Sequence, residues 1–437
     1  MTQESNLPAT SNVLIVAFHF PPQAGSSGLL RALKLCRYLP EFGWRPTVLT
    51  LNPRAYESLD PLGHSSVPAG TDVIRTFALD TKRQLGWRGR YLDWMALPDR
   101  WVSWMLGAVP AGLRAIRSRR IDVIFSTFPI ASAVLVGYVL HKLMGKAWVV
   151  DLRDSMTEDG YPRDARRRRV WRWLERKAML HASRVVFTTQ STRRMYLERY
   201  PHLSPEKCLL IANGYDEEDF SSLRASEAGP FDGTRPLRLL HTGLIYPEER
   251  DPRPFFRALA RLKREGKISA TNLNIALRAS GSEDLYQKII NELAISDLIQ
   301  LRPHIPYRQS LQECLDSDGL LLFQAANCDH QIPAKAYEYL RVRRPILALT
   351  THTGDTAALL NEVDGATIVD LANENEIYAG LPGFLEAVRT GTHSLADPRR
   401  IQRYNRRNQI LELAKCLSDL KSSRTATTFE KAESFAR

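Results

Sequence analysis

The sequence alternates between short apolar segments and longer segments with helical spacing, and this alternation limits the fold more than any other feature. The apolar segments begin at residues 13–18 and recur as far as residues 208–214, and a second series runs from residues 237–243 to residues 367–371. Strands that alternate with helices predict a parallel sheet covered on both faces. The sequence therefore predicts an α/β fold of two similar Rossmann-like α/β/α domains that face each other across a cleft.

Changes in composition place the expected domain boundaries. Residues 221–236 are small, polar and interrupted by Gly and Pro, which is typical of a linker. The resulting prediction has six parts: a disordered leader at 1–12, an N-terminal domain at 13–220, the linker at 221–236, a C-terminal domain at 237–395, a helix at 396–420 that packs back toward the N-terminal domain, and a disordered tail at 421–437.

The composition indicates a globular protein in a reducing environment. The chain has 437 residues, of which 44% are hydrophobic and 25% charged. Its five cysteines are scattered, odd in number and without C-x-x-C spacing, which predicts reduced thiols, no disulfides and no zinc site. The N-terminus does not resemble a signal peptide, and residues 130–140 are too short to span a bilayer. We expect a cytoplasmic protein.

A net charge of +12 indicates an anionic partner. Much of that charge lies between Arg163 and Lys177, and residues 85–112 mix four tryptophans with arginines. An anionic membrane surface, with the protein peripheral on the inner face of the plasma membrane, suits both segments. The alternatives are a solvated basic helix and an aromatic core. No nucleic-acid partner is expected, because the basic run lacks interleaved aromatic residues and no recognised module surrounds it.

Candidate site residues follow the predicted strands of both halves, and parallel sheets bind ligands at the carboxyl ends of their strands. In the first half these residues are His19, the loop Gly25–Gly28, the segment Asp151–Asp154 with Arg153, and Asn213. A Gly-rich loop between a strand and a helix can bring backbone N–H groups to a phosphate. A turn that serves only close packing is the alternative.

The second half has a strand end at Gly243, followed by Arg250, and a predicted helix that starts near Pro333. Lys335 and Glu338 lie three residues apart and so share a face of that helix. A helix N-terminus beside a lysine attracts phosphate, and a glutamate can accept hydrogen bonds from sugar hydroxyls. Arg250 could grip a phosphate in a bidentate way. The alternative is a helix with a solvated polar face.

Six segments in order resemble GT-B-fold glycosyltransferases of the retaining, family-four-like group, especially bacterial enzymes of exopolysaccharide and surface-glycan synthesis. The segments are FPPQAGSSGLLRALKLCRYLPEFGWRPTVLT, LPDRWVSW, VVDLRDSM, NGYDEEDF, HTGLIYPEERDPRPFFRAL and PAKAYEYLRVRRPILAL. The resemblance implies a nucleotide-sugar donor, UDP- or GDP-linked, held mainly by the C-terminal domain, and an acceptor on the side of the N-terminal domain. It also implies transfer with retention to a glycan or polyprenyl-linked hydroxyl, with no metal and no cofactor.

The resemblance assigns roles to single residues. Glu338 matches the glutamate that holds the donor ribose, Arg250 matches the arginine on the diphosphate, and Gly25 and Gly28 match the glycine loop that faces the phosphates. Arg250, Lys335, Glu338 and Asp154 are the predicted catalytic residues. His19, Asp151, Arg153, Asn213 and His330 are the predicted sugar or acceptor contacts.

The sequence departs from the family at two positions. His330 stands where the family has a second glutamate, and the lysine that often follows the arginine is absent, so Lys335 is expected to supply the missing charge. The predicted function is a hexosyltransferase or related glycosyltransferase of surface polysaccharide synthesis. A non-catalytic GT-B protein that binds a glycan or a protein partner is the alternative.

Overall fold

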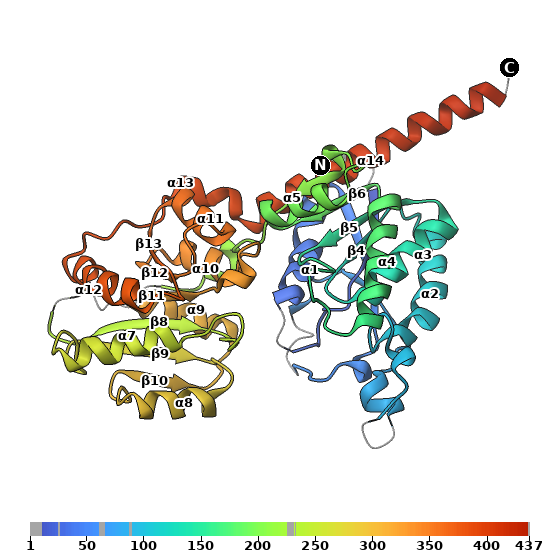
Figure 1. The fold of residues 1–437 in the computed structure, drawn as a ribbon. Coiled ribbons are helices and arrows are strands. Elements are labelled where there is room, and N and C mark those ends of the chain that lie inside the picture. The colour runs from blue at the N-terminus through green and yellow to red at the C-terminus, as the bar shows by residue number, and fades with distance from the viewer. Residues whose placement is uncertain are drawn as a thin grey trace. The chain divides into compact units, whose positions relative to one another are not determined.

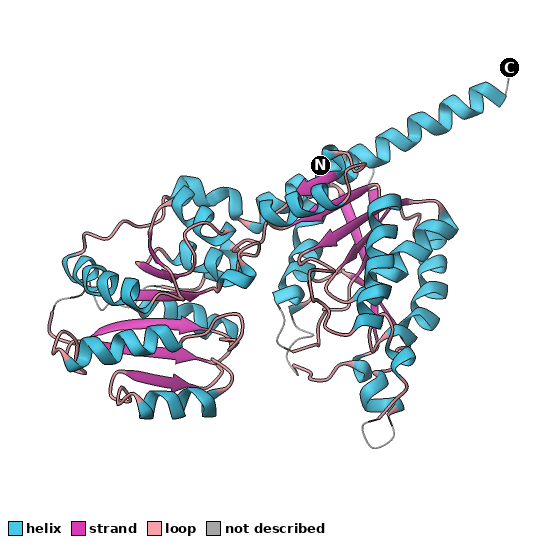
Figure 2. Ribbon diagram, viewed as in Figure 1, coloured by secondary structure: helices cyan, strands magenta, loops and turns pink. Residues whose placement is uncertain are grey.

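The structure is a computed structural model that describes residues 11–24, 27–60, 66–86, 90–224, 231 and 233–435. The chain divides into two compact units, the first made of residues 1–212 and 407–437 and the second of residues 213–406. Each unit is a parallel sheet with helices around it (Figures 1 and 2). This arrangement confirms the predicted α/β fold class. Of the expected leader at 1–12, residues 1–10 lie outside the described residues, and the first strand begins at Ser11.

The first unit contains a seven-stranded sheet in the order β3-β2-β1-β4-β5-β6-β7. Its strands are β1 (Ser11–Val16), β2 (Trp44–Leu51), β3 (Asp72–Thr76), β4 (Val123–Thr127), β5 (Ala147–Leu152), β6 (Arg184–Phe187) and β7 (Cys208–Leu210). Its helices are α1 (Ser27–Tyr38), α2 (Met105–Ser118), α3 (Ala131–Met144), α4 (Ala165–His181), α5 (Gln190–Arg199) and nearly all of α14 (Arg406–Phe435).

The second unit contains a six-stranded sheet in the order β10-β9-β8-β11-β12-β13. Its strands are β8 (Leu237–Thr242), β9 (Leu273–Arg278), β10 (Ile299–Arg302), β11 (Gly319–Phe323), β12 (Ile346–Leu349) and β13 (Ala366–Val369). Its helices are α6 (Glu217–Phe220), α7 (Arg253–Arg264), α8 (Glu283–Glu292), α9 (Tyr307–Asp316), α10 (Ala334–Val342), α11 (Asp355–Val363), α12 (Glu374–Thr390) and α13 (Pro398–Ile401).

Both sheets follow the same doubly wound order, in which the strand sequence reverses beside the first strand of the unit. In the first unit the reversal lies between β1 and β4, and in the second it lies between β8 and β11. Ligands of such sheets bind at this switch point, outside the carboxyl ends of the strands. The residues that follow β1, β5, β8 and β11 are therefore the ones to examine for function.

The last helix of the chain completes the core of the first unit. Ile410, Leu413 and Leu417 of α14 are buried in one cluster with Val13 and Ile15 of β1. The opposite face of this sheet is covered by α2, α3, α4 and α5, whose apolar residues form a second cluster. The run at residues 130–140 is accordingly the buried helix α3. Burial of both faces explains why the central strands read as continuous apolar runs.

The structure places two boundaries differently from the sequence prediction. The first unit ends at Ala212, ahead of the expected linker at 221–236, because the segment after it is tied to the second unit. The backbone of Tyr215 bonds to Tyr404, and Arg341 of α10 grips Glu217 with a 2.7 Å bond. At the other end α14 continues through the expected disordered tail at 421–437 as far as Phe435.

The tryptophans of residues 85–112 differ in their burial. Trp104 is fully buried in the core and donates to Thr76, and the partly buried Trp101 packs against the same core and donates from Nε1 to the Ala55 carbonyl. Trp94, in contrast, is 68% exposed, and Trp87 lies outside the described residues. Among the described helices, none has the length and apolar character needed to cross a membrane.

Candidate functional site

Helix α10 is fixed against the carboxyl end of β8 by one tyrosine. The hydroxyl of Tyr339 accepts a 2.9 Å hydrogen bond from the Thr242 backbone N–H and lies 3.2 Å from the Thr242 hydroxyl. Since side chains four residues apart share a face of a helix, Lys335 lies one turn before Tyr339 on the same side. This contact places the first turn of α10 at the end of β8.

Lys335 lies directly over Gly243. Gly243 follows β8 with φ +88°, and a Cβ built on it would lie 3.2 Å from the Lys335 Nζ atom. That Nζ atom is 3.0 Å from Nε2 of His241, a fully buried residue of β8. Burial lowers the pKa of the Lys335 ammonium well below its usual range, and the nearby Arg250 guanidinium lowers it further. The structure thus brings the predicted residues Gly243 and Lys335 together, with an unpredicted histidine beneath them.

Arg250 approaches the same place from the loop after β8. Its Nη1 donates to the Leu244 carbonyl at 2.8 Å, and its guanidinium lies 5.3 Å from the centre of the Tyr246 ring. The Arg250 Nε atom is buried without a hydrogen-bond partner among the described residues. An unpaired buried donor is costly, and an incoming anion would satisfy it. Arg250 and Lys335 thus form a cationic pair at the carboxyl end of β8.

Glu338 is held by a residue of the preceding helix. The Tyr307 hydroxyl at the start of α9 donates a 2.7 Å hydrogen bond to Oε1 of Glu338. Burial raises the pKa of the Glu338 carboxyl, while the Tyr307 bond acts in the opposite direction. The second carboxyl oxygen of Glu338 can accept hydrogen bonds from the hydroxyls of a ligand.

His330 lies in the turn between β11 and α10, four residues before the helix starts. Its Nε2 atom is 3.4 Å from the Gln331 side-chain amide. The neighbouring Asp329 is directed to the start of α11, where its Oδ1 lies 2.9 Å from a Cβ built on Gly354. The loop therefore carries a carboxylate next to the position where the family has one, but this carboxylate faces α11.

A second group of predicted residues gathers at the carboxyl edge of the first unit. A Cβ on Gly28 would lie 2.6 Å from Nη2 of Arg153, so the glycine allows the guanidinium to lie against α1. Nε of Arg153 donates to the Phe128 carbonyl at 2.7 Å. His19 follows β1, and its Nδ1 lies 2.8 Å from Oε1 of Gln23. Burial and the nearby Arg153 lower the pKa of His19 to about 4, so its ring is neutral at pH 7.

The structure corrects the expectation that Asp151 contacts a ligand. Asp151 is fully buried, and Arg31 of α1 grips its two oxygens with bonds of 3.0 and 2.8 Å. Thr127 donates a further bond of 3.0 Å to the same carboxylate. Since its oxygens are already bonded in the core, Asp151 supports Arg31 and α1.

The remaining predicted residues are placed as follows. Asp154 lies in the loop after β5, and Asn213 is the first residue of the second unit. Gly25 lies outside the described residues. Within the described ranges, the His, Cys, Asp and Glu side chains form no group of three or more that could hold a metal ion.

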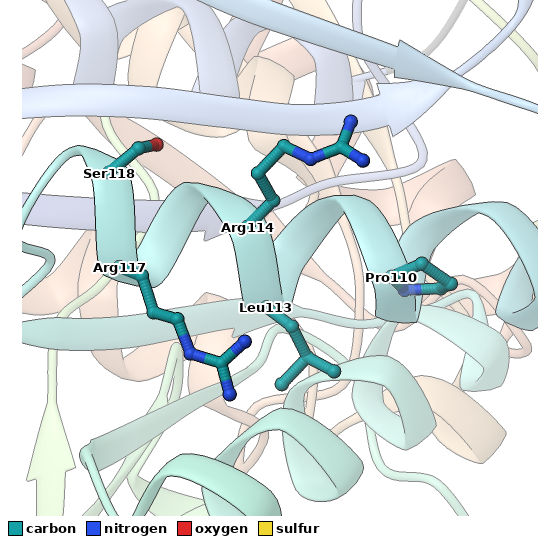
Figure 3. A pocket seen from close by; sticks show the side chains of 5 residues that line it. All are labelled: Pro110, Leu113, Arg114, Arg117 and Ser118. Carbon is teal, nitrogen blue, oxygen red and sulfur yellow. The ribbon is translucent and has the colours of Figure 1, made fainter.

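A separate hollow of about 590 Å³ lies along α2 and contains no predicted site residue. Figure 3 shows Leu113 and Arg117 on one side of the helix and Arg114 on the other. The residues that line it are Pro110, Leu113, Arg114, Arg117 and Ser118. Because β4 starts soon after α2 ends, this half of α2 lies toward the amino ends of the strands, away from the edge that binds ligands.

Comparisons with known proteins agree with this geometry. The profile of the family described as "Glycosyl transferase 4-like domain" matches residues 30–214. Residues 30–214 thus resemble a glycosyltransferase domain, and the two-unit fold of the chain is of the GT-B type. A search of curated proteins finds no match for this chain.

Similar solved structures span nearly all of this chain. Sucrose-phosphate synthase of Thermosynechococcus elongatus is 14% identical with a TM-score of 0.64, and the match covers 94% of this chain and 100% of that one. The lipopolysaccharide outer core galactosyltransferase WaaB is 12% identical with a TM-score of 0.60, at coverages of 94% and 99%. Anabaena HepE in complex with UDP-glucose is 13% identical with a TM-score of 0.57, at coverages of 96% and 99%.

Three residues of these sites were not predicted from the sequence. His241 and Tyr307 lie beneath or beside the predicted residues of the second unit, and Arg31 supports the first. A weak signal existed for His241, which directly precedes Thr242 and Gly243 at a predicted strand end, and for Arg31, which lies one turn after the Gly-rich loop. Nothing in the sequence around Tyr307 indicates that it reaches a residue of α10.

Proposed function

We propose that this protein is a glycosyltransferase that moves a sugar from a nucleotide-sugar donor to a hydroxyl of a glycan or polyprenyl-linked acceptor, with retention at the anomeric carbon, in surface polysaccharide synthesis. The donor is proposed to bind the second unit, at the carboxyl ends of β8 and β11. The acceptor is proposed to bind the first unit near His19, Gly28 and Arg153, with Asp154 as a further catalytic residue.

The observation that carries the proposal is the cationic pair at the end of β8. Arg250 and Lys335 both approach the end of β8, where Gly243 has no side chain to displace the Lys335 Nζ atom, and the N-terminus of α10 adds a partial positive charge. Transfer from a nucleotide sugar develops negative charge on the departing diphosphate. Donors placed in advance, in a site with little water, stabilise such charge strongly. These groups can act on the diphosphate without a metal, which is the form of the reaction that we propose.

Glu338 is proposed to bind the ribose of the donor. Its Oε1 accepts from Tyr307, which fixes the carboxylate and leaves Oε2 to accept from ribose hydroxyls. The related HepE was solved with UDP-glucose and, in another structure, with UDP and glucose, which supports a uridine nucleotide as the first donor to test. His330 is proposed to contact the donor sugar in place of the family glutamate, and Asn213 is proposed as an acceptor contact.

A direct test measures nucleotide release and transfer by the purified protein with a panel of UDP- and GDP-sugars. We expect stabilisation in a thermal-shift assay by the matching donor, because a ligand that binds only the native state raises its stability. Lys335→Ala should lose kcat at least tenfold, whereas Lys288→Ala, at an exposed position on α8, should retain it. Unchanged turnover in Lys335→Ala would exclude Lys335 from the mechanism.

The same assay distinguishes an active enzyme from a non-catalytic GT-B protein. That alternative is favoured by His330, which stands where the family has a glutamate. Binding of a glycan without any turnover of nucleotide sugars would support that alternative. NMR of the anomeric proton of the product would distinguish retention from inversion.

The proposal also places the enzyme peripherally on the inner face of the plasma membrane. Trp94 and Leu92 are 68% and 61% exposed, Leu106 of α2 is 73% exposed, and α4 is rich in exposed arginines. Exposed aromatic and aliphatic groups together with basic residues suit an anionic bilayer surface. Vesicle flotation tests this: Trp94→Ser should weaken binding to anionic vesicles, and Leu285→Ser, an exposed site on α8, should not. Equal flotation with neutral vesicles would contradict the electrostatic part.

A further inference from the structure

The contacts of His241 fix the orientation of its ring. Its Nδ1 lies 2.8 Å from the Leu321 carbonyl, and its Nε2 lies 3.1 Å from the Gly243 carbonyl and 3.0 Å from the Lys335 Nζ atom. The side chain is fully buried, and its ring packs edge-on against Phe323 at 5.1 Å. The ring therefore has a single orientation between two strands and α10.

The protonation of this ring follows from its neighbours. Both ring nitrogens lie near a carbonyl oxygen, which only accepts, and a neutral ring has one hydrogen to donate. The shorter contact of Nδ1, together with the Lys335 donor beside Nε2, places that hydrogen on Nδ1, which donates it to the Leu321 carbonyl. Burial lowers the pKa of His241 well below its usual range, and the positive charge of Lys335 lowers it further. The ring is therefore neutral, and its Nε2 has a free lone pair. Lys335 Nζ donates to that lone pair.

Because the partner of Lys335 is a neutral imidazole, the ammonium charge stays available for a ligand. A carboxylate in the place of His241 would compete with a phosphate for the ammonium charge. A neutral imidazole accepts one of the three N–H bonds of Lys335, fixes the end of a flexible side chain and leaves the remaining N–H bonds for an anion. Gly243 has no side chain that would displace the same Nζ atom.

We propose that His241 is a positioning residue that holds the Lys335 ammonium over Gly243, aimed at the diphosphate of the donor; this inference rests on the proposed function. His241 acts through Lys335 and does not touch the donor. The arrangement also couples donor binding to a proton. Lys335 lies near Arg250 in a buried site, which favours loss of its proton, and an anionic diphosphate reverses that preference. Donor binding therefore raises the pKa of Lys335 and favours its protonated form.

The first experiment compares His241→Phe with His241→Gln. Phenylalanine fills the space but accepts nothing, whereas the glutamine amide oxygen can accept from Lys335. We expect His241→Phe to lose kcat at least tenfold with a smaller change in KM, and His241→Gln to recover part of that loss. His393→Phe is the matched control in the same unit, since this histidine contacts Thr367 and Phe384 and no residue of the site. Equal kcat in His241→Phe and the wild type would overturn the proposal.

The second experiment does not depend on turnover. NMR of protein labelled with ¹³C at the lysine ε-carbon follows the titration of Lys335, whose signal is the one absent from Lys335→Arg. We expect His241→Phe and His241→Gln each to shift this titration, and UDP to move it to higher pH in the wild type. A Lys335 titration that is identical in the wild type and both variants would overturn the pairing. A shifted titration in a protein that turns over no donor would instead contradict the proposed function and leave the pairing intact.

Discussion

Replacing Gly243 with alanine tests the donor site through a single methyl group. Gly243 has φ +88°, and a methyl group there would lie 3.2 Å from Nζ and 3.6 Å from Cε of Lys335. An L-residue in the left-handed region costs about 1–2 kcal/mol. The methyl group must also displace the lysine end by a few tenths of an ångström. Misplacing a catalytic group by about 1 Å can cost about 100-fold in rate, so we expect roughly a tenfold loss, or about 1.4 kcal/mol.

Gly266 provides a matched control in the same unit. It has φ +71°, and a Cβ built on it meets nothing within 4 Å. Gly266→Ala therefore has the same backbone cost without the contact to Lys335. For a unit of this size we expect each variant to lower Tm by about 2–4 °C per kcal/mol. Only Gly243→Ala should lower kcat/KM.

The assay compares kcat/KM and Tm for Gly243→Ala, Gly266→Ala, Lys335→Ala and the double variant of Gly243 and Lys335. Residues in contact give non-additive effects, so Gly243→Ala should cost little activity once Lys335 is already alanine. Equal activity losses in Gly243→Ala and Gly266→Ala, or fully additive losses in the double variant, would refute the placement of Lys335 over Gly243.

The remaining predictions concern buried ionisable groups. His19 has a pKa lowered to about 4, so the folded protein binds fewer protons than the unfolded chain between pH 6.5 and pH 4. The free energy of unfolding should therefore fall by up to about 3 kcal/mol as the pH is lowered through that range. Urea denaturation of His19→Gln should show a weaker dependence of this free energy on pH. Glu338 has a raised pKa, so its ionisation costs stability as pH rises through that value; Glu338→Gln should raise Tm at pH 8 and not at pH 4, while calorimetry shows weaker UDP binding. Asp151→Asn leaves Arg31 without its carboxylate and should cost about 3–5 kcal/mol by denaturant titration, whereas Asp297→Asn, at an exposed pair with Lys263, should cost under about 1 kcal/mol.

The sequence predicts the elements whose pattern is strongly periodic and buried. The expected strand at 237–243 differs from β8 by one residue, and the expected strand at 367–371 overlaps β13. Strand β3 was missed, since four of its five residues are only partly buried and its sequence DVIRT has no apolar run. Helices α11 and α12 were also missed. Residues 355–363 lie within a polar, turn-like context, and α12 contains Pro382.

The site shows a different limit of sequence reasoning. Lys335 and Glu338 could be placed on one helix face, because their spacing is local. The partner of each comes from another element: His241 lies 94 residues from Lys335, and Tyr307 lies 31 residues from Glu338. Strand-end position likewise selects Asp151 but does not reveal that Arg31 already occupies its carboxylate. Such pairings depend on the register of the strands and on how the helices pack, and neither can be predicted from the local pattern of one sequence.

The position of α14 in the first unit has a consequence during synthesis of the protein. Ile410, Leu413, Leu417 and Leu420 bury their side chains in the core that β1 begins. Burial of four such side chains is worth about 6–12 kcal/mol, which is comparable to the whole stability of a typical domain. The ribosome finishes residue 212 roughly 200 residues before it reaches this helix, a delay of about 10–40 s. The unit that is made first is therefore the one that finishes folding last, and until then one face of its sheet needs protection from aggregation.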